Sequence, residues 1–143
     1  MPMLPYLLLI LSFFQFSASN TQQDCSKETG IAYETLQKEF YDFQTSYNND
    51  VVGKFFACFW KKNGVMNAEG IVNKDAFIDY FTEFAHINRN NTAEFVDNDM
   101  VDFDFEQNEQ VDAIRVVNCV KIGFFALTFA DREPKDLLKM MMT

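Results

Sequence analysis

Few residues in this chain have the chemistry that catalysis requires. Histidine occurs once, as His86, and no nucleophile motif accompanies it. General acid–base catalysis needs a proton-transfer group placed beside a reacting group. We therefore interpret His86 as a surface or helix-end histidine, with pH sensing as its alternative role. The sequence predicts no catalytic residue and no cofactor, so the protein is not expected to be an enzyme.

The oxygen-bearing side chains do not occur at the spacing that a metal-binding loop requires. The segment Asn67–Asn73 superficially resembles a calcium-binding loop. With Gly70 at the sixth position of such a loop, Val65 would be first and Ala76 twelfth, and neither carries a side-chain oxygen for calcium. The acidic run Asp97–Asp99 lacks the required glycine and glutamate. We predict no metal site.

Cysteine is the remaining reactive residue type, and it occurs at Cys25, Cys58 and Cys119. In an oxidising compartment an odd count means either one bridge and one leftover thiol or an intermolecular bond. Spacing alone allows any of the three pairings. Cys119 lies in a segment rich in apolar residues, which favours a buried, inert thiol over a nucleophile.

The N-terminal residues predict that the protein is secreted. Residues 4–16 are almost continuously apolar, and Ser17, Ala18 and Ser19 are the small residues that signal peptidase requires. This layout is typical of a secretory signal peptide, although the usual basic region is missing. The apolar run is shorter than the roughly 20 residues of a membrane-spanning helix. We expect a signal peptide at 1–19, one domain at 20–143 and secretion into extracellular fluid.

The charge and the phenylalanine content limit the kinds of partner that the protein can bind. The net charge of −9 falls entirely after residue 19, which argues against nucleic acid and anionic membranes because both need clustered Lys and Arg. Phenylalanine is abundant, with 17 residues in the chain. Aromatic side chains bury large areas, so the domain has enough apolar material for a core and, as a sharper hypothesis, for the lining of an apolar cavity.

The domain is predicted to consist of amphipathic helices. Apolar residues recur at steps of three and four, as in Phe77, Phe81 and Phe84 after a predicted N-cap at Asn73. The predicted helices are Ile31–Phe43, Val51–Lys62, the helix after Asn73, a short helix within Phe95–Glu109 that leads into an acidic loop, and Gln110–Ala130.

The connections carry further expectations. Asn88–Thr92 is predicted to be an exposed polar connection, and it contains the sequon Asn90-Asn91-Thr92, so Asn90 is the candidate glycosylation site. Pro134 should end the last helix. The Met-rich tail Leu137–Met142 is expected to pack loosely over the mouth of a cavity.

Three segments resemble a known family. They are Cys25-Ser26-Lys27-Glu28-Thr29-Gly30 before a helix, the stretch Cys58–Gly70 in which one helix ends in a turn and another follows, and Cys119 in the last long helix. Their order and spacing resemble those of insect odorant-binding proteins over most of the predicted mature chain.

The resemblance has departures with consequences. The family typically has six cysteines in three bridges, and its second and fifth cysteines would fall at Lys54 and Gln110. The fourth should lie between Phe95 and Val101, so Cys119 is left as a free thiol. The resemblance implies that Cys25 and Cys58 form the surviving bridge, which should contribute about 3–4 kcal/mol. The helix that usually precedes the first cysteine is expected to be absent.

The resemblance implies an all-α fold, an irregular bundle of about five to six short helices around an apolar cavity. It also implies a carrier of small apolar ligands, in chemosensation or in another secretion such as seminal fluid or saliva. A receptor would be a partner of the chemosensory carrier. A protein-interaction module with a collapsed cavity is the third alternative, and its partner would be a second copy of the chain joined through Cys119. The candidate ligand-binding residues are Phe55, Phe59, Phe77, Phe81, Phe84, Val117, Val120, Phe124 and Phe125.

Overall fold

The computed structural model describes residues 21–40, 44–98, 105, 107–128, 137–138 and 141–142. The predicted signal peptide, the residues of the acidic loop at 99–104 and Pro134 lie outside these described residues. No helix in the described part is long and apolar enough to cross a membrane.

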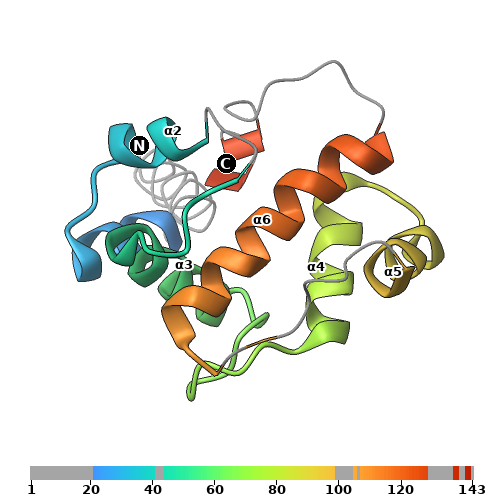
Figure 1. Ribbon diagram of the computed structural model, residues 1–143, viewed down its shortest axis with the longest axis horizontal. Helices are drawn as coiled ribbons and strands as arrows, with labels where there is room; N and C mark the ends of the chain where they lie inside the picture. Colours follow the sequence, from blue (N-terminus) through green and yellow to red (C-terminus); the bar gives the residue numbers. More distant parts are fainter. Residues whose placement is uncertain are drawn as a thin grey trace, which may run out of the picture.

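Within that part of the chain, every regular element is a helix, so the predicted all-α class is confirmed (Figure 1). The single β contact there is an isolated antiparallel bridge between Met66 and Val72. Residues 21–29 are helical, and five further helices follow: α2 Tyr33–Glu39, α3 Asp50–Lys62, α4 Lys74–Ala85, α5 Arg89–Asn98 and α6 Glu109–Thr128.

Asparagine side chains begin two of these helices. The Oδ1 of Asn49 accepts a hydrogen bond of 3.2 Å from the backbone N–H of Val52 in α3. The predicted N-cap Asn73 does the same for α4, accepting from Ala76 at 2.9 Å. Both bonds satisfy backbone donors that have no partner inside the helix.

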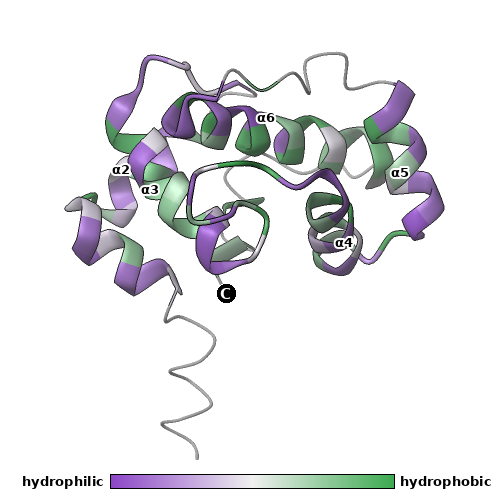
Figure 2. Ribbon diagram, turned by 90° about the horizontal axis from the view of Figure 1, so that it is seen from below, coloured by the Kyte–Doolittle hydropathy of each residue, from purple (hydrophilic) through white to green (hydrophobic). Residues whose placement is uncertain are grey.

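Helix α6 runs through the middle of the molecule, with α2 and α3 on one side and α4 and α5 on the other (Figure 1). The helices carry both hydrophobic and hydrophilic residues, as expected of amphipathic helices that bury one face and expose the other (Figure 2). The buried indole of Trp60 in α3 donates a hydrogen bond of 3.0 Å to the carbonyl of Ala113 in α6. This contact joins the two helices at the centre of the core.

The two helices approach closely because α3 has a glycine at the crossing. A Cβ atom added to Gly53 would lie 3.0 Å from both the Cβ and the carbonyl oxygen of Gln110. The resemblance placed two missing cysteines at Lys54 and Gln110. The structure puts Gln110 against Gly53, the neighbour of Lys54, so close packing occupies the region where the family has a bridge.

The predicted connection Asn88–Thr92 is wrong, because helix α5 already begins at Arg89. The carbonyl of Asn88 accepts from the backbone N–H of Thr92 at 3.1 Å, which starts the helix. Thr92, Phe95 and Val96 are buried at the i, i+3 and i+4 spacing of one helix face. The polar residues Arg89 to Asn91 form the exposed face, and this concealed the helix in the sequence.

Two other expectations need correction. The predicted helix Ile31–Phe43 is shorter in the structure, because α2 ends at Glu39 and Phe40 is its C-cap. The tail does not pack loosely, since Leu137 and Leu138 are fully buried and Met141 and Met142 are only 8% exposed.

Candidate functional site

A cleft of about 740 Å³ opens between helix α4 and three other segments of the chain. These segments are the start of the helical residues 21–29, the end of α3 and the C-terminal methionines. The residues that line it are Thr21, Gln22, Phe59, Asn63, Ala76, Asp79, Tyr80, Glu83, Phe84, Met141 and Met142.

Helix α4 supplies one wall through a single stripe of its surface. Ala76, Tyr80 and Phe84 follow one another at i+4 spacing, and Asp79 and Glu83 form a parallel row beside them. The rings of Tyr80 and Phe84 are stacked with their planes 2° apart and their centroids at 6.0 Å. The wall therefore combines an aromatic row with a carboxylate row.

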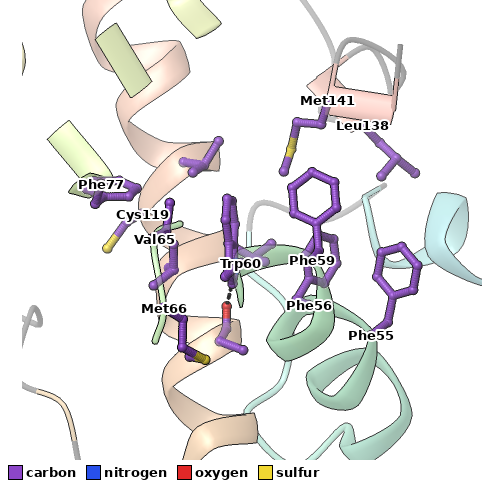
Figure 3. Packing of buried hydrophobic residues seen from close by; sticks show 14 of the residues in the cluster. Phe55, Phe56, Phe59, Trp60, Val65, Met66, Phe77, Cys119, Leu138 and Met141 are labelled. Carbon is purple, nitrogen blue, oxygen red and sulfur yellow. Dashed lines mark hydrogen bonds between the residues drawn. The ribbon is translucent and has the colours of Figure 1, made fainter. Parts of the chain in front are cut away.

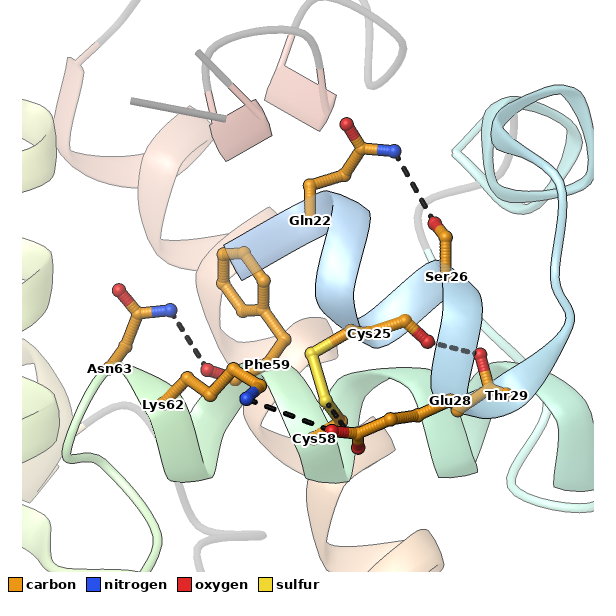
Figure 4. The surroundings of a disulfide bond; sticks show 9 residues. All are labelled: Gln22, Cys25, Ser26, Glu28, Thr29, Cys58, Phe59, Lys62 and Asn63. Atoms are coloured by element: carbon orange, nitrogen blue, oxygen red, sulfur yellow. Dashed lines mark hydrogen bonds and ion pairs between the residues drawn. A yellow bond between two sulfur atoms is a disulfide. The ribbon is translucent and has the colours of Figure 1, made fainter. Parts of the chain in front are cut away.

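The opposite wall depends on the disulfide between Cys25 and Cys58, whose Cα atoms are 5.6 Å apart. Phe59 follows Cys58 directly, and Gln22 lies about one turn before Cys25 (Figure 4). An ion pair of 3.7 Å between Lys62 and Glu28 spans the same two elements. The bridge thus holds together the two segments that carry the lining residues Gln22 and Phe59.

The C-terminal methionines complete the enclosure. Phe59 points toward Met141, and Leu138 lies on the same side of α3 (Figure 3). Methionine is flexible and polarisable, so it adapts to rings and to ligands of irregular shape. Met141 and Met142 of the tail thus line the cleft, but they are buried and do not pack loosely as predicted.

Electrostatically, the cleft is acidic. Asp79 accepts a hydrogen bond of 2.8 Å from the Nε of Arg89, and this bond raises the pKa of the guanidinium. Burial raises the pKa of the Tyr80 hydroxyl, which therefore stays neutral. In the described part of the chain, no group of His, Cys, Asp and Glu side chains is arranged to hold a metal ion.

The predicted ligand-binding residues separate into three groups. Phe59 and Phe84 line the cleft. Phe77 and Phe81 instead line a second, narrow crevice that has no room for a water molecule. The others lie outside both linings, with Phe125 half-buried and the rest in the core: Phe55, Val117, Val120 and Phe124.

Sequence reasoning missed the polar half of the cleft. It treated the Phe77–Phe81 face of α4 as inward-facing, and that face does pack against α5 and α6 through Phe95 and Gly123. The signal that could have revealed the cleft was the second aromatic row, Tyr80 and Phe84, beside two carboxylates.

The crevice also contains Cys119, which is free of disulfide bonding and only 4% exposed. Phe95 and Val96 of α5 line the same crevice. That is the region where the resemblance expected the missing partner cysteine.

The other candidate residues are exposed. His86 is the C-cap of α4 in a left-handed conformation with φ of 55°. Asn90 lies in the first turn of α5, while Thr92 of the same sequon is fully buried.

Comparison with known proteins gives one match. Residues 14–121 match the family model described as the PBP/GOBP family, which covers more than half of the chain. No curated protein and no solved structure matches the chain.

Proposed function

The chain belongs to the PBP/GOBP family, the insect odorant-binding proteins, and from this premise we propose that it is a secreted carrier of small hydrophobic ligands in extracellular fluid. Members of this family are binding proteins and not enzymes. The proposed cargo comprises odorants, pheromones or lipids, and the proposed biological role is odorant binding in chemosensation.

The cleft is the observation that supports this proposal. Its volume of about 740 Å³ lies within the roughly 300–1,000 Å³ of typical small-molecule sites. Phe59, Phe84 and the two methionines offer apolar walls. Each methylene group buried there would contribute about 0.8 kcal/mol, so a medium-length chain can reach micromolar affinity after ordering costs.

A non-sensory role in another secretion, such as seminal fluid or saliva, is the second candidate. The same cleft would serve it, and the tissue of expression separates the two roles. The third candidate, a protein-interaction module with a collapsed cavity, is disfavoured by the open cleft. Burial of Cys119 also disfavours a dimer joined through that thiol.

The first test is secretion of the full chain from a eukaryotic host. We expect the protein in the medium with an N-terminus near Asn20, as read by N-terminal sequencing. An Asn90→Gln variant should lose the mass added by an N-glycan, because Asn90 is exposed and carries the sequon. Retention of residues 1–19 in the secreted protein would contradict the predicted signal peptide.

The second test is titration of the secreted protein with the neutral probe N-phenyl-1-naphthylamine. Saturable micromolar binding, displaced by apolar competitors according to chain length, is the expected result. A protein that is folded by circular dichroism but binds neither probe nor competitor would contradict the carrier function.

A further inference from the structure

Among the described residues that line the cleft, the ionisable side chains are Asp79, Glu83 and Tyr80, and none of these described lining residues is Lys, Arg or His. On the α4 wall, a carboxylate ligand would therefore meet the negative charge of the two carboxylates. A protonated amine would meet charge of the opposite sign.

The two carboxylates are not equivalent. Asp79 is paired with Arg89, which neutralises much of its charge. Glu83 has no ion-pair partner among the residues that the structure describes. Glu83 is therefore the carboxylate available to a ligand.

The neutral polar groups of the cleft point to the same chemistry. Asn63 uses its Nδ2 to donate to the carbonyl of Phe59 at 2.8 Å, and Gln22 directs its Nε2 to the Oγ of Ser26 at 3.4 Å. Figure 4 shows the side-chain oxygens of both residues directed away from these bonds. Those oxygens are hydrogen-bond acceptors, so Asn63 and Gln22 can accept hydrogen bonds from the N–H groups of a protonated amine.

Aromatic faces complete the environment. Tyr80 and Phe84 stack beside Glu83 on α4, and Phe59 of α3 lines the same cleft. The face of an aromatic ring carries partial negative charge and attracts cations within about 6 Å of its centroid. The same rings also provide apolar surface for an alkyl chain.

We propose that the cleft prefers amphiphiles with a protonated amine head group, with Glu83 as the residue that determines this preference. Alcohols of the same chain length bind less tightly, and carboxylates bind least. This inference rests on the proposed carrier function and names the ligand class of the same cleft.

The test compares decylamine, decanol and decanoate as competitors of N-phenyl-1-naphthylamine at pH 7, using the secreted full-chain product. We expect decylamine to bind about tenfold more tightly than decanol, a difference of about 1.4 kcal/mol. Decanoate should bind more weakly than decanol. The preference for the amine should shrink in about 0.5 M NaCl because salt screens charges at the surface.

Two matched variants separate a local effect from the overall charge of −9. Glu83→Gln should reduce the amine-to-alcohol preference about fivefold. Glu94→Gln removes the same charge from an exposed position of α5 outside the cleft, and it should preserve the preference.

The possible outcomes test the amine preference separately from the proposed carrier function. If the probe and all three competitors fail to bind, the carrier function fails and the inference with it. If decanol binds but decylamine binds no more tightly, the carrier function stands and the amine preference is overturned. Equal effects of Glu83→Gln and Glu94→Gln would also overturn the assigned role of Glu83.

Discussion

The indole ring of Trp60 meets the ring of Tyr80 edge-on, with the centroids 5.2 Å apart and the planes at 87°. Trp60 itself is fully buried, while Tyr80 lines the cleft. The tryptophan thus lies directly behind one wall of the proposed ligand site. Since the chain has 1 Trp, its fluorescence reports on this position alone.

Ligand binding should therefore change the intrinsic fluorescence of the protein. We expect a saturable change in Trp60 emission, with the same midpoint as displacement of the apolar probe. A Tyr80→Phe variant keeps the aromatic contact and should keep the response. Probe displacement without any change at Trp60 would place the bound ligand away from the α4 wall.

The rings of Phe84 and Phe124 are neighbours, with centroids 6.1 Å apart, but substituting Phe84 should mainly affect ligand binding and substituting Phe124 should mainly affect stability. Phe84 is half-buried in the cleft lining, so Phe84→Ala should weaken ligand binding several-fold with a modest loss of stability. Phe124 is only 2% exposed, and Phe124→Ala should cost about 3–5 kcal/mol of unfolding free energy. Urea denaturation and probe titration of both variants measure the two effects. Comparable stability losses would show that Phe84 is also core.

The close crossing of α3 and α6 should make Gly53 intolerant of a side chain. Gly53→Ala gains about 1 kcal/mol of helix propensity, but its Cβ would meet the backbone of Gln110 at 3.0 Å. Overpacking of this kind typically costs about 1–3 kcal/mol, so we expect net destabilisation in urea denaturation. Lys54→Ala, on the exposed neighbour, should change stability by less than about 0.5 kcal/mol. A stabilised Gly53→Ala variant would show that the helices can move apart.

The two classes of cysteine should differ in reactivity. Reducing the Cys25–Cys58 bridge, which closes a loop of 33 residues, should lower stability by about 3–4 kcal/mol. Cys119 should resist iodoacetamide in the folded protein and react once the protein is unfolded in urea, because it is only 4% exposed. Mass spectrometry counts the alkylated thiols. Rapid labelling of the folded protein, or a disulfide-linked dimer on a non-reducing gel, would contradict this burial.

Burial of Tyr80 should appear in a pH titration. The pKa of its hydroxyl is raised above the ordinary value of 10.0 by desolvation. The pKa of Tyr80 is higher in the folded state than in the unfolded chain. The contribution of its neutral hydroxyl to the free energy of unfolding is therefore fully present below about pH 10, and it is lost as the pH rises through the folded-state pKa. Absorbance at about 295 nm should show a late-ionising tyrosine, and Tyr80→Phe should remove it. If Tyr80→Phe instead removed a tyrosine that ionises near the ordinary pKa of 10.0, the hydroxyl of Tyr80 would be hydrated and not buried.

Local sequence patterns were sufficient to predict most of the helices. The N-cap Asn73 and the apolar steps Phe77–Phe81 predicted α4, and long apolar periodicity predicted α6. These signals are local, because a helix depends on caps and on side chains three or four residues apart. The same patterns predicted the all-α class, and the resemblance of the three cysteine-containing segments to the family implied it as well. Helix α5 was missed at its start because its exposed face is polar and its buried face begins with Thr92.

The position of the cleft was decided only by the tertiary structure. Periodicity shows that α4 carries aromatic residues on two neighbouring stripes, but it does not say which stripe meets α5 and α6. Phe77 and Phe81 face those helices, and Tyr80 and Phe84 are left to the cleft. The remaining walls come from residues 21–22, 59, 63 and 141–142, which are distant from α4 in sequence. Their meeting depends on a disulfide and on long-range packing, and no local pattern encodes either.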